Sequence, residues 1–200
     1  MMNIAIFGGS FNPPHKAHLR IASEFFEKLS LDKMLIIPTF IAPHKEIKYY
    51  VSAEERLKMC RLMFPDDKFT VSDLEIKREG KSYTIDTLEA LCEEYPGAKF
   101  YLIIGSDMLL SFHRWYRYED ILKKCTLCVM TRESSVTKGE MLWYAGSTLG
   151  LSEKDMVLSD AGAYEMSSTL IREKIAKKED VSDCLTKEVE DYIKEKGLYL

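Results

Sequence analysis

The sequence predicts an α/β fold in which a doubly wound, mainly parallel sheet carries helices on both faces. Two observations lead to this fold class. Short β-rich runs alternate along the chain with segments whose apolar residues recur at helical spacing. The expected strands begin about 25 to 35 residues apart, which leaves room for a helix in each connection and favours right-handed βαβ crossovers. In such sheets ligands bind at loops that follow the strands.

The expected strands are short and mostly apolar. They cover residues 3–7, 34–38, 69–76, 100–104, 126–131 and 156–159. The expected helices cover residues 17–29, 84–95, 138–149, 167–177 and 186–196, with a further helix that starts after Ser52 and ends before Pro65. Ser52 and Glu55 have the spacing of a capping box at the start of that helix. No repeat or long linker interrupts the alternation, so a single domain is expected over residues 1–200.

The composition describes an ordinary globular protein, with 46% hydrophobic residues and a net charge of −4. A slightly acidic chain lacks the broad basic face that nucleic-acid binders use, so no nucleic acid is expected as a partner. The longest apolar runs are far shorter than the roughly 20 residues that cross a bilayer, and the first residues lack the pattern of a secretory signal. We therefore expect a cytoplasmic protein without membrane contact. Whether it forms a homo-oligomer stays open.

The five cysteines are an odd number in a chain of 200 residues, which favours reduced thiols over a disulfide framework. Cys125 and Cys128 have the spacing of a metal or redox pair. They fall at an expected strand, however, where an odd separation points side chains to opposite faces of the sheet. We therefore expect these two thiols to pack in the core and to carry no chemistry.

The segment between the first expected strand and the first expected helix carries the strongest functional signal. It reads Gly8-Gly9-Ser10-Phe11-Asn12-Pro13-Pro14-His15-Lys16-Ala17-His18. Glycines let backbone N–H groups approach a phosphate, and the following helix presents unpaired N–H groups and its positive dipole end to an anion. His15 and His18 are three residues apart and can reach one ligand. A histidine there can donate to phosphate oxygens as charge develops in a transition state.

Other interpretations of this loop fit it less well. The glycine spacing is not that of the dinucleotide-binding fingerprint, and the Gly-Lys-Ser/Thr of a P-loop is absent. Two histidines could bind a metal, yet no carboxylate or further histidine is placed nearby in the sequence to complete the ligand set. Capping of the helix by one histidine would leave the Gly-Gly-Ser turn unexplained. The phosphate interpretation is therefore the one we adopt.

The segment from Gly8 to His18 resembles the Gly-x-Phe-x-Pro-x-His-x-Gly-His loop of the nucleotidyltransferase superfamily. Ala17 replaces the usual glycine, and alanine is well tolerated in a first helical turn. The resemblance implies a Rossmann-like nucleotidyltransferase fold and transfer of a nucleotidyl group from a nucleoside triphosphate. It also implies that His18 and His15 are catalytic and that Gly8, Gly9, Ser10 and Phe11 bind the phosphates.

Further segments narrow the resemblance to the bacterial nicotinate-nucleotide adenylyltransferases, along the whole chain. Gly105-Ser106-Asp107 and Trp115-Tyr116 are similar to that family's substrate loop. A carboxylate such as Asp107 can accept ribose hydroxyls, and a tryptophan face can stack on a pyridine ring. The resemblance implies that the nicotinate carboxylate is held by backbone donors of Thr84 and Tyr116, at the start of the helix over residues 84–95. Thr84 is equally well explained as the N-cap of that helix, and Trp115 has core packing as its alternative.

A last segment resembles the family's Ile-Ser-Ser-Thr-x-Ile-Arg motif, with Met166 in place of the first isoleucine. The resemblance places Ser168, Thr169 and Arg172 at the triphosphate, where Arg172 would neutralise the departing pyrophosphate. Helix capping by serine is the plain alternative for this segment. Lys45 and Arg132 are expected as further phosphate contacts, together with Gly105.

The resemblance implies that ATP and nicotinate mononucleotide are the substrates. The phosphate of the acceptor would attack the α-phosphorus of ATP directly, with Mg²⁺ accompanying ATP and held mainly by phosphate oxygens and water. Two alternatives stay open: an adenylyltransferase of the same superfamily with another acceptor, such as phosphopantetheine, and a noncatalytic nucleotide-binding regulator. The acceptor that the protein uses distinguishes the first alternative from a nicotinate-nucleotide adenylyltransferase. Release of pyrophosphate distinguishes any adenylyltransferase from the second alternative.

Overall fold

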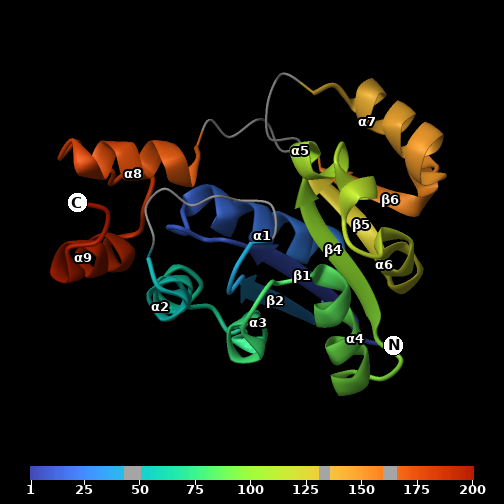
Figure 1. The fold of residues 1–200 in the computed structure, drawn as a ribbon, viewed down its shortest axis with the longest axis horizontal. Helices are drawn as coiled ribbons and strands as arrows, with labels where there is room; N and C mark the ends of the chain where they lie inside the picture. The colour runs from blue at the N-terminus through green and yellow to red at the C-terminus, as the bar shows by residue number, and fades with distance from the viewer. Residues whose placement is uncertain (43–50, 131–135, 160–165) are drawn as a thin grey trace. The chain divides into compact units, whose positions relative to one another are not determined.

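The computed structural model describes residues 1–42, 51–130, 136–159 and 166–200. Its sheet has the strand order β3-β2-β1-β4-β5-β6 (Figure 1). The strands are β1 (Asn3–Gly9), β2 (Lys33–Pro38), β3 (Phe69–Val71), β4 (Lys99–Gly105), β5 (Cys125–Met130) and β6 (Met156–Ser159). β1 pairs with β4, β4 with β5, and β5 with β6, all in parallel. The order reverses direction between β1 and β4, so the predicted doubly wound α/β class is confirmed.

The helices lie between and after these strands. They are α1 (Lys16–Lys28), α2 (Ala53–Met63), α3 (Leu74–Arg78), α4 (Thr84–Glu94), α5 (Ser106–Leu109), α6 (Tyr118–Lys124), α7 (Lys138–Tyr144), α8 (Ser168–Ala176) and α9 (Lys187–Lys196). Short 3-10 helices lie at Phe112–Arg114 and Glu153–Asp155, and a π-helical turn continues α7 over Ala145–Leu149. The helices expected from the sequence are all present, and their ends agree to within one or two residues, except that α7 ends at Tyr144 and the π-helical turn completes the helix expected over 138–149.

The central strands form because their residues are apolar without interruption. In β4 the six residues from Phe100 to Gly105 are all buried, as are the last four of β5. Strands buried on both faces are typical of a parallel sheet covered by helices on each side. The register pairs Leu102 with Leu127 and Ile104 with Val129, so the apolar side chains of the two strands meet row by row.

One expected strand was wrong in its length. The sequence predicted a strand over residues 69–76, whereas β3 ends at Val71 and α3 begins at Leu74. The hydroxyl of Ser72 accepts the N–H of Leu74 at 3.3 Å, which turns the chain out of the sheet. The polar and apolar alternation of this segment therefore belonged to a turn followed by a short helix.

The expected capping box of α2 is half realised. The Ser52 hydroxyl accepts the N–H of Glu55 at 3.1 Å, as predicted. The carboxylate of Glu55, however, accepts the phenolic hydroxyl of Tyr192 on α9 at 2.5 Å. Glu55 thus joins two helices that pack against each other.

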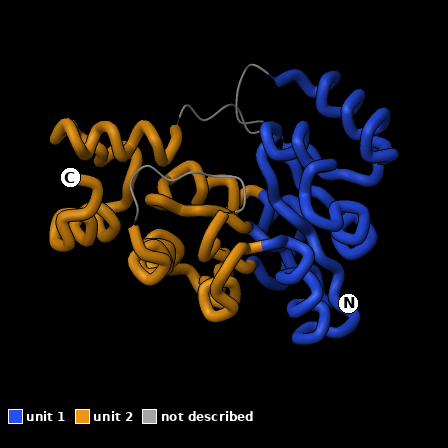
Figure 2. The backbone as a smooth tube through the Cα atoms, viewed as in Figure 1, with its two compact units in different colours: residues 1–7, 25–34, 83–165 blue, residues 8–24, 35–82, 166–200 orange. Residues whose placement is uncertain are grey.

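The chain divides into two compact units, each assembled from segments far apart in the sequence (Figure 2). Unit 1 comprises residues 1–7, 25–34 and 83–165, and unit 2 comprises residues 8–24, 35–82 and 166–200. The expectation of a single domain stays a prediction. Within the described ranges, no helix has both the length and the apolar character that crossing a membrane requires.

The five cysteines are free thiols, and Cys60, Cys128 and Cys184 are buried. Burial raises the pKa of Cys128 to about 12, and burial likewise raises the pKa of Cys125 to about 12. Thiols with such pKa values stay protonated at neutral pH, and a protonated thiol is a poor nucleophile and metal ligand.

Candidate active site

The loop that follows β1 lies in unit 2, and its backbone path is fixed by close packing. A Cβ atom on Gly9 would lie 3.2 Å from the ring of Phe11, so only glycine fits there without displacing that ring. Phe11 itself is buried and has a left-handed backbone with φ of 45°. A Cβ on Gly8 would instead meet Ile37 O at an ordinary 4.0 Å. Packing against Phe11 therefore favours glycine at position 9, whereas the described residues leave room for a side chain at position 8.

The two histidines stack on each other at the start of α1. Their ring centroids are 3.6 Å apart with an angle of 27° between the planes, and both residues are buried. The backbone N–H of His15 donates to Nδ1 of His18 at 3.1 Å. Because Nδ1 accepts this bond, a neutral His18 carries its proton on Nε2. The fold therefore makes Nε2 of His18 a hydrogen-bond donor.

The start of α8 is bonded to the same loop. Ser168 Oγ donates to the carbonyl of Pro13 at 2.8 Å, and Arg172 Nη1 donates to the carbonyl of Asn12 at 2.8 Å. Arg172 Nη2 also donates to the hydroxyl of Thr169 at 3.1 Å. The structure thus bonds two residues of the predicted Ser-Ser-Thr-x-Ile-Arg motif, Ser168 and Arg172, to the glycine loop, and Thr169 to Arg172. It also shows a loop-bracing role that the sequence interpretation missed.

Further residues that hold this loop were not found from the sequence. The phenolic hydroxyl of Tyr199 donates to Oδ1 of Asn12 at 2.7 Å in a buried position. Burial raises the pKa of Tyr199, so the phenol stays protonated and remains a donor. Lys16 Nζ donates to the carbonyl of Ser182, and Lys16 N donates to the carbonyl of Cys184. These contacts join segments more than 160 positions apart, and no local pattern in the sequence announces them.

The predicted pyridine-binding residues lie in unit 1. Trp115 is half-buried, and its ring centroid is 4.9 Å from that of the buried Phe112. Tyr116 is 56% exposed, and its ring centroid is 4.9 Å from that of Tyr83. Thr84 is the first residue of α4, because Tyr83 occupies the N-cap position. The N-cap interpretation of Thr84 was therefore wrong by one residue, while its N–H belongs to the first helical turn, where N–H groups have no partner within the helix.

Arg117 directly follows the Trp115-Tyr116 pair and has a left-handed backbone with φ of 54° and ψ of 43°. Its guanidinium pairs with Glu89 on α4 at 2.9 Å and with Asp120 on α6 at 2.9 Å. The hydrogen bond to Asp120 raises the pKa of Arg117 above its usual value, and the hydrogen bond to Glu89 adds a smaller effect in the same direction. The sequence interpretation did not single out this residue. The sequence feature that could have indicated Arg117 is its position between two aromatic residues, Tyr116 and Tyr118.

The remaining candidates lie at the ends of β4 and outside the described residues. Gly105 is the last residue of β4, and Asp107 lies exposed in the first turn of α5. Lys45 and Arg132 lie outside the described residues. In the part of the chain that the structure describes, no three His, Cys, Asp or Glu side chains gather into a metal-binding cluster.

Comparison with known proteins agrees with the fold and the loop. The fold, with its glycine turn and histidine pair, is of the nucleotidyltransferase class, and a family model described as cytidylyltransferase-like matches residues 6–174. The chain belongs to this family and, within it, to the nicotinate-nucleotide adenylyltransferases.

Two relatives and one solved structure illustrate this membership. A Clostridium tetani protein named "Probable nicotinate-nucleotide adenylyltransferase" is 36% identical over 200 residues, which is 100% of each chain. A Listeria monocytogenes protein of the same name is 38% identical over 197 residues, covering 98% of this chain and 96% of the relative. The nicotinic acid mononucleotide adenylyltransferase of Plasmodium falciparum, solved with NaAD, has a TM-score of 0.78 at 20% identity, covering 100% of this chain and 98% of that one. The last comparison supports the fold.

Proposed function

We propose that this protein joins the AMP portion of ATP to nicotinate mononucleotide and releases pyrophosphate, a step of NAD biosynthesis in the cytoplasm. Full-length relatives at 36% and 38% identity carry the name of this activity. The observation on which the proposal chiefly rests is the histidine pair: a buried His18 whose Nδ1 accepts a backbone N–H and whose Nε2 is therefore a donor. Such a fixed donor suits an enzyme that stabilises a charged phosphorus centre.

The phosphate side of the proposed site is the loop from Gly8 to Phe11. The backbone N–H groups of Gly8, Gly9, Ser10 and Phe11 would face the phosphates, helped by the positive end of α1. Among the described residues, none packs closely enough to require glycine at position 8, and close approach of a phosphate would supply a reason for it. His15 stacks on His18 and fixes the plane of its ring.

The leaving-group side of the proposed site is the start of α8. Arg172, Ser168 and Thr169 would stabilise the departing pyrophosphate, with Lys45, Gly105 and Arg132 as further contacts. The structure supports the first part of this assignment, because Arg172 and Ser168 are bonded to the carbonyls of Asn12 and Pro13 in the glycine loop. The planar fork of a guanidinium matches the geometry of phosphate oxygens.

The residues that we assign to acceptor binding lie in unit 1. Trp115 would stack on the pyridine ring, while the N–H groups of Thr84 and Tyr116 would bind the nicotinate carboxylate and Asp107 the ribose hydroxyls. The position of Thr84 in the first turn of α4 supports the carboxylate assignment, because that turn favours negative charge. The contact between the rings of Tyr83 and Tyr116 holds the two carboxylate-binding segments next to each other.

The reaction we propose is a direct in-line displacement. An oxygen of the acceptor phosphate forms a bond to the α-phosphorus of ATP. At the same time the bond between the α-phosphorus and the oxygen that bridges to the β-phosphate breaks. Pyrophosphate leaves with the electrons of that bond. Nε2 of His18 would donate to a non-bridging oxygen of the reacting phosphate. Holding the two substrates in the geometry for attack can lower the activation free energy by up to roughly 7 to 11 kcal/mol. Mg²⁺ bound to the triphosphate would supply charge neutralisation.

The proposal is tested by the acceptor that the purified protein uses. ATP and Mg²⁺ are incubated with nicotinate mononucleotide, nicotinamide mononucleotide or phosphopantetheine in turn, and dinucleotide and pyrophosphate are measured. We expect product with nicotinate mononucleotide only. Product with phosphopantetheine alone would assign a different adenylyltransferase, and ATP binding without pyrophosphate release from any acceptor would indicate a noncatalytic regulator.

A further inference from the structure

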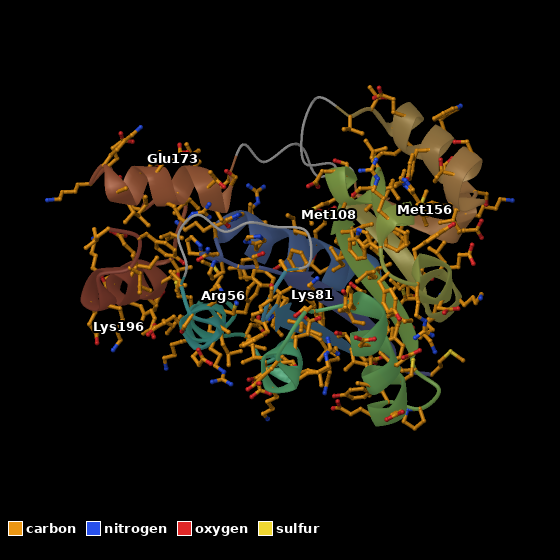
Figure 3. All side chains as sticks on the ribbon, viewed as in Figure 1. Arg56, Lys81, Met108, Met156, Glu173 and Lys196 are labelled. Atoms are coloured by element: carbon orange, nitrogen blue, oxygen red, sulfur yellow. The ribbon has the colours of Figure 1, made fainter. Side chains whose placement is uncertain are left out.

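Arg56 on α2 is a buried cation that the proposed reaction does not use. Arg56 is 2% exposed, and its side chain is one of the largest fully buried side chains among the described residues. Figure 3 labels Arg56 on α2. Removing a guanidinium from water costs several kcal/mol before any compensation, so such a residue needs a reason to be there. A signal of it existed in the sequence, because Arg56 lies beside Ala53, Leu57 and Cys60 on the apolar stripe of its helix.

The hydrogen bonds of Arg56 reach two separate loops of unit 2. Nη1 donates to the carbonyl of Ser10 at 2.7 Å, and Nη2 donates to the carbonyls of Thr39 at 2.6 Å and Phe40 at 3.1 Å. Nε is 3.4 Å from the carbonyl of Val51. All four acceptors are backbone oxygens. The planar fork of the guanidinium thus joins the loop after β1 to the loop after β2.

A second bond joins the same two loops, because the N–H of Thr39 donates to the carbonyl of Gly9 at 2.9 Å. The peptides on both sides of Ser10 are therefore held from the interior. The carbonyl of Ser10 and the N–H of Phe11 belong to one planar trans peptide, so they point in opposite directions. When Arg56 fixes that carbonyl towards α2, it also aims the N–H of Phe11 away from α2.

We propose that Arg56 is a positioning residue for the phosphates of ATP: it acts through the Ser10–Phe11 peptide and fixes the direction of the Phe11 N–H in the glycine loop. This inference rests on the proposed function. It explains why the residue is arginine, since lysine has a charge but lacks the two-pronged donor that reaches Ser10 and Thr39 together. The buried charge also polarises the Ser10–Phe11 peptide and makes its N–H a stronger donor.

The test compares Arg56→Lys with Arg61→Lys, a matched change at an exposed position of the same helix. We expect Arg56→Lys to raise the KM and the calorimetric Kd for ATP about 10-fold or more, the loss typical of a hydrogen bond to a charged group. The KM for nicotinate mononucleotide should stay within about twofold, and Arg61→Lys should leave all these constants unchanged. A lower unfolding midpoint with an unchanged Kd for ATP would show a purely structural role and overturn the proposal.

A measurement on the unaltered protein avoids any dependence on how the variant folds. Labelling with ¹⁵N-phenylalanine gives the amide resonances of the nine phenylalanines. Once the resonance of Phe11 is assigned among them, we expect it to shift strongly when ATP is added. A resonance that does not move under saturating ATP would overturn the proposal. The reaction assay distinguishes failure of the proposed function from failure of the role of Arg56. An unaltered protein that forms no dinucleotide contradicts the proposed function. An active protein whose Phe11 resonance does not move contradicts only the role of Arg56.

Discussion

The two units support their candidate residues in different ways. In unit 2 the glycine loop is held by polar side chains that bond its backbone and side-chain oxygens: the buried Arg56 to Ser10, the half-buried Arg172 to Asn12 and the buried Tyr199 to Asn12. In unit 1 the segment that carries Trp115 and Tyr116 is held by ring contacts and by the exposed ion pairs of Arg117.

The difference matches the tasks that we assign to the two regions. A donor that stabilises a transition state must be in place before reaction, and buried hydrogen bonds provide such rigidity. Exposed ion pairs contribute about 0 to 1 kcal/mol each and weaken with salt, so they tolerate adjustment around a bound ring. We therefore expect changes in the loop to act on kcat and ATP binding, and changes in the aromatic segment to act on acceptor binding.

The largest effect is expected for His18→Ala. Loss of one fixed donor to a developing negative charge lowers kcat by roughly 10²- to 10³-fold in other enzymes, and we expect a similar loss here. The Kd for ATP should change by less than about fivefold, because backbone N–H groups and α1 retain most of the phosphate binding. His113→Ala serves as the control, since the ring of His113 is exposed and bonded to the hydroxyl of Tyr144. A kcat within threefold of the unaltered enzyme would remove His18 from the mechanism.

The next effect concerns Tyr199→Phe, which deletes only the hydroxyl that donates to Asn12. Loss of a buried donor costs about 1 to 3 kcal/mol in the free energy of unfolding, measured by urea titration. Because Asn12 belongs to the glycine loop, kcat should fall as well. Tyr192→Phe removes the hydroxyl bonded to Glu55 and should lower stability while leaving kcat unchanged. Equal kcat in the two variants would show that Tyr199 does not position the loop.

A smaller effect is expected for Trp115→Ala. Aromatic stacking is worth about 0.5 to 1.5 kcal/mol beyond area burial, so the KM for nicotinate mononucleotide should rise about 2- to 12-fold with the KM for ATP unchanged. The chain has two tryptophans, and Trp143 is 73% exposed. In a Trp143→Phe background, fluorescence comes from Trp115 alone, and nicotinate mononucleotide should quench it. Unchanged fluorescence at saturating acceptor would exclude stacking.

How well the sequence predicted the molecule depended on how local each signal is. The apolar runs of β4 and β5 and the motif from Gly8 to His18 are continuous in the sequence, so they could be found without coordinates. The strand expected over residues 69–76 was too long because the hydroxyl of Ser72 opens a turn, and its bond to Leu74 outweighs an alternating pattern. Local side-chain hydrogen bonds of this kind compete with strand formation.

The supports of the candidate site were the part that the sequence could not predict. Tyr199 and Asn12 are 187 positions apart, and their hydrogen bond depends on the path of the whole chain. Ser168 and Arg172 were found as a motif, but their bonds to Pro13 and Asn12 became visible only in three dimensions. A motif indicates which residues contact a ligand. The residues that position those ligand-contacting residues come from distant segments and form no sequence pattern of their own.

The smallest effect, and the sharpest test of the contrast, is the coupling between Arg117 and Glu89. Arg117→Gly removes the side chain and keeps the left-handed backbone accessible, and Glu89→Gln removes the charge of its partner. A double-mutant cycle on the KM for nicotinate mononucleotide should give a coupling of about 0.2 to 1 kcal/mol at low salt, and less in 0.5 M NaCl, where the screening length is roughly 4 Å. A coupling above about 2 kcal/mol that resists salt would mean that the aromatic segment is held as firmly as the glycine loop, and that acceptor binding also depends on a rigid frame.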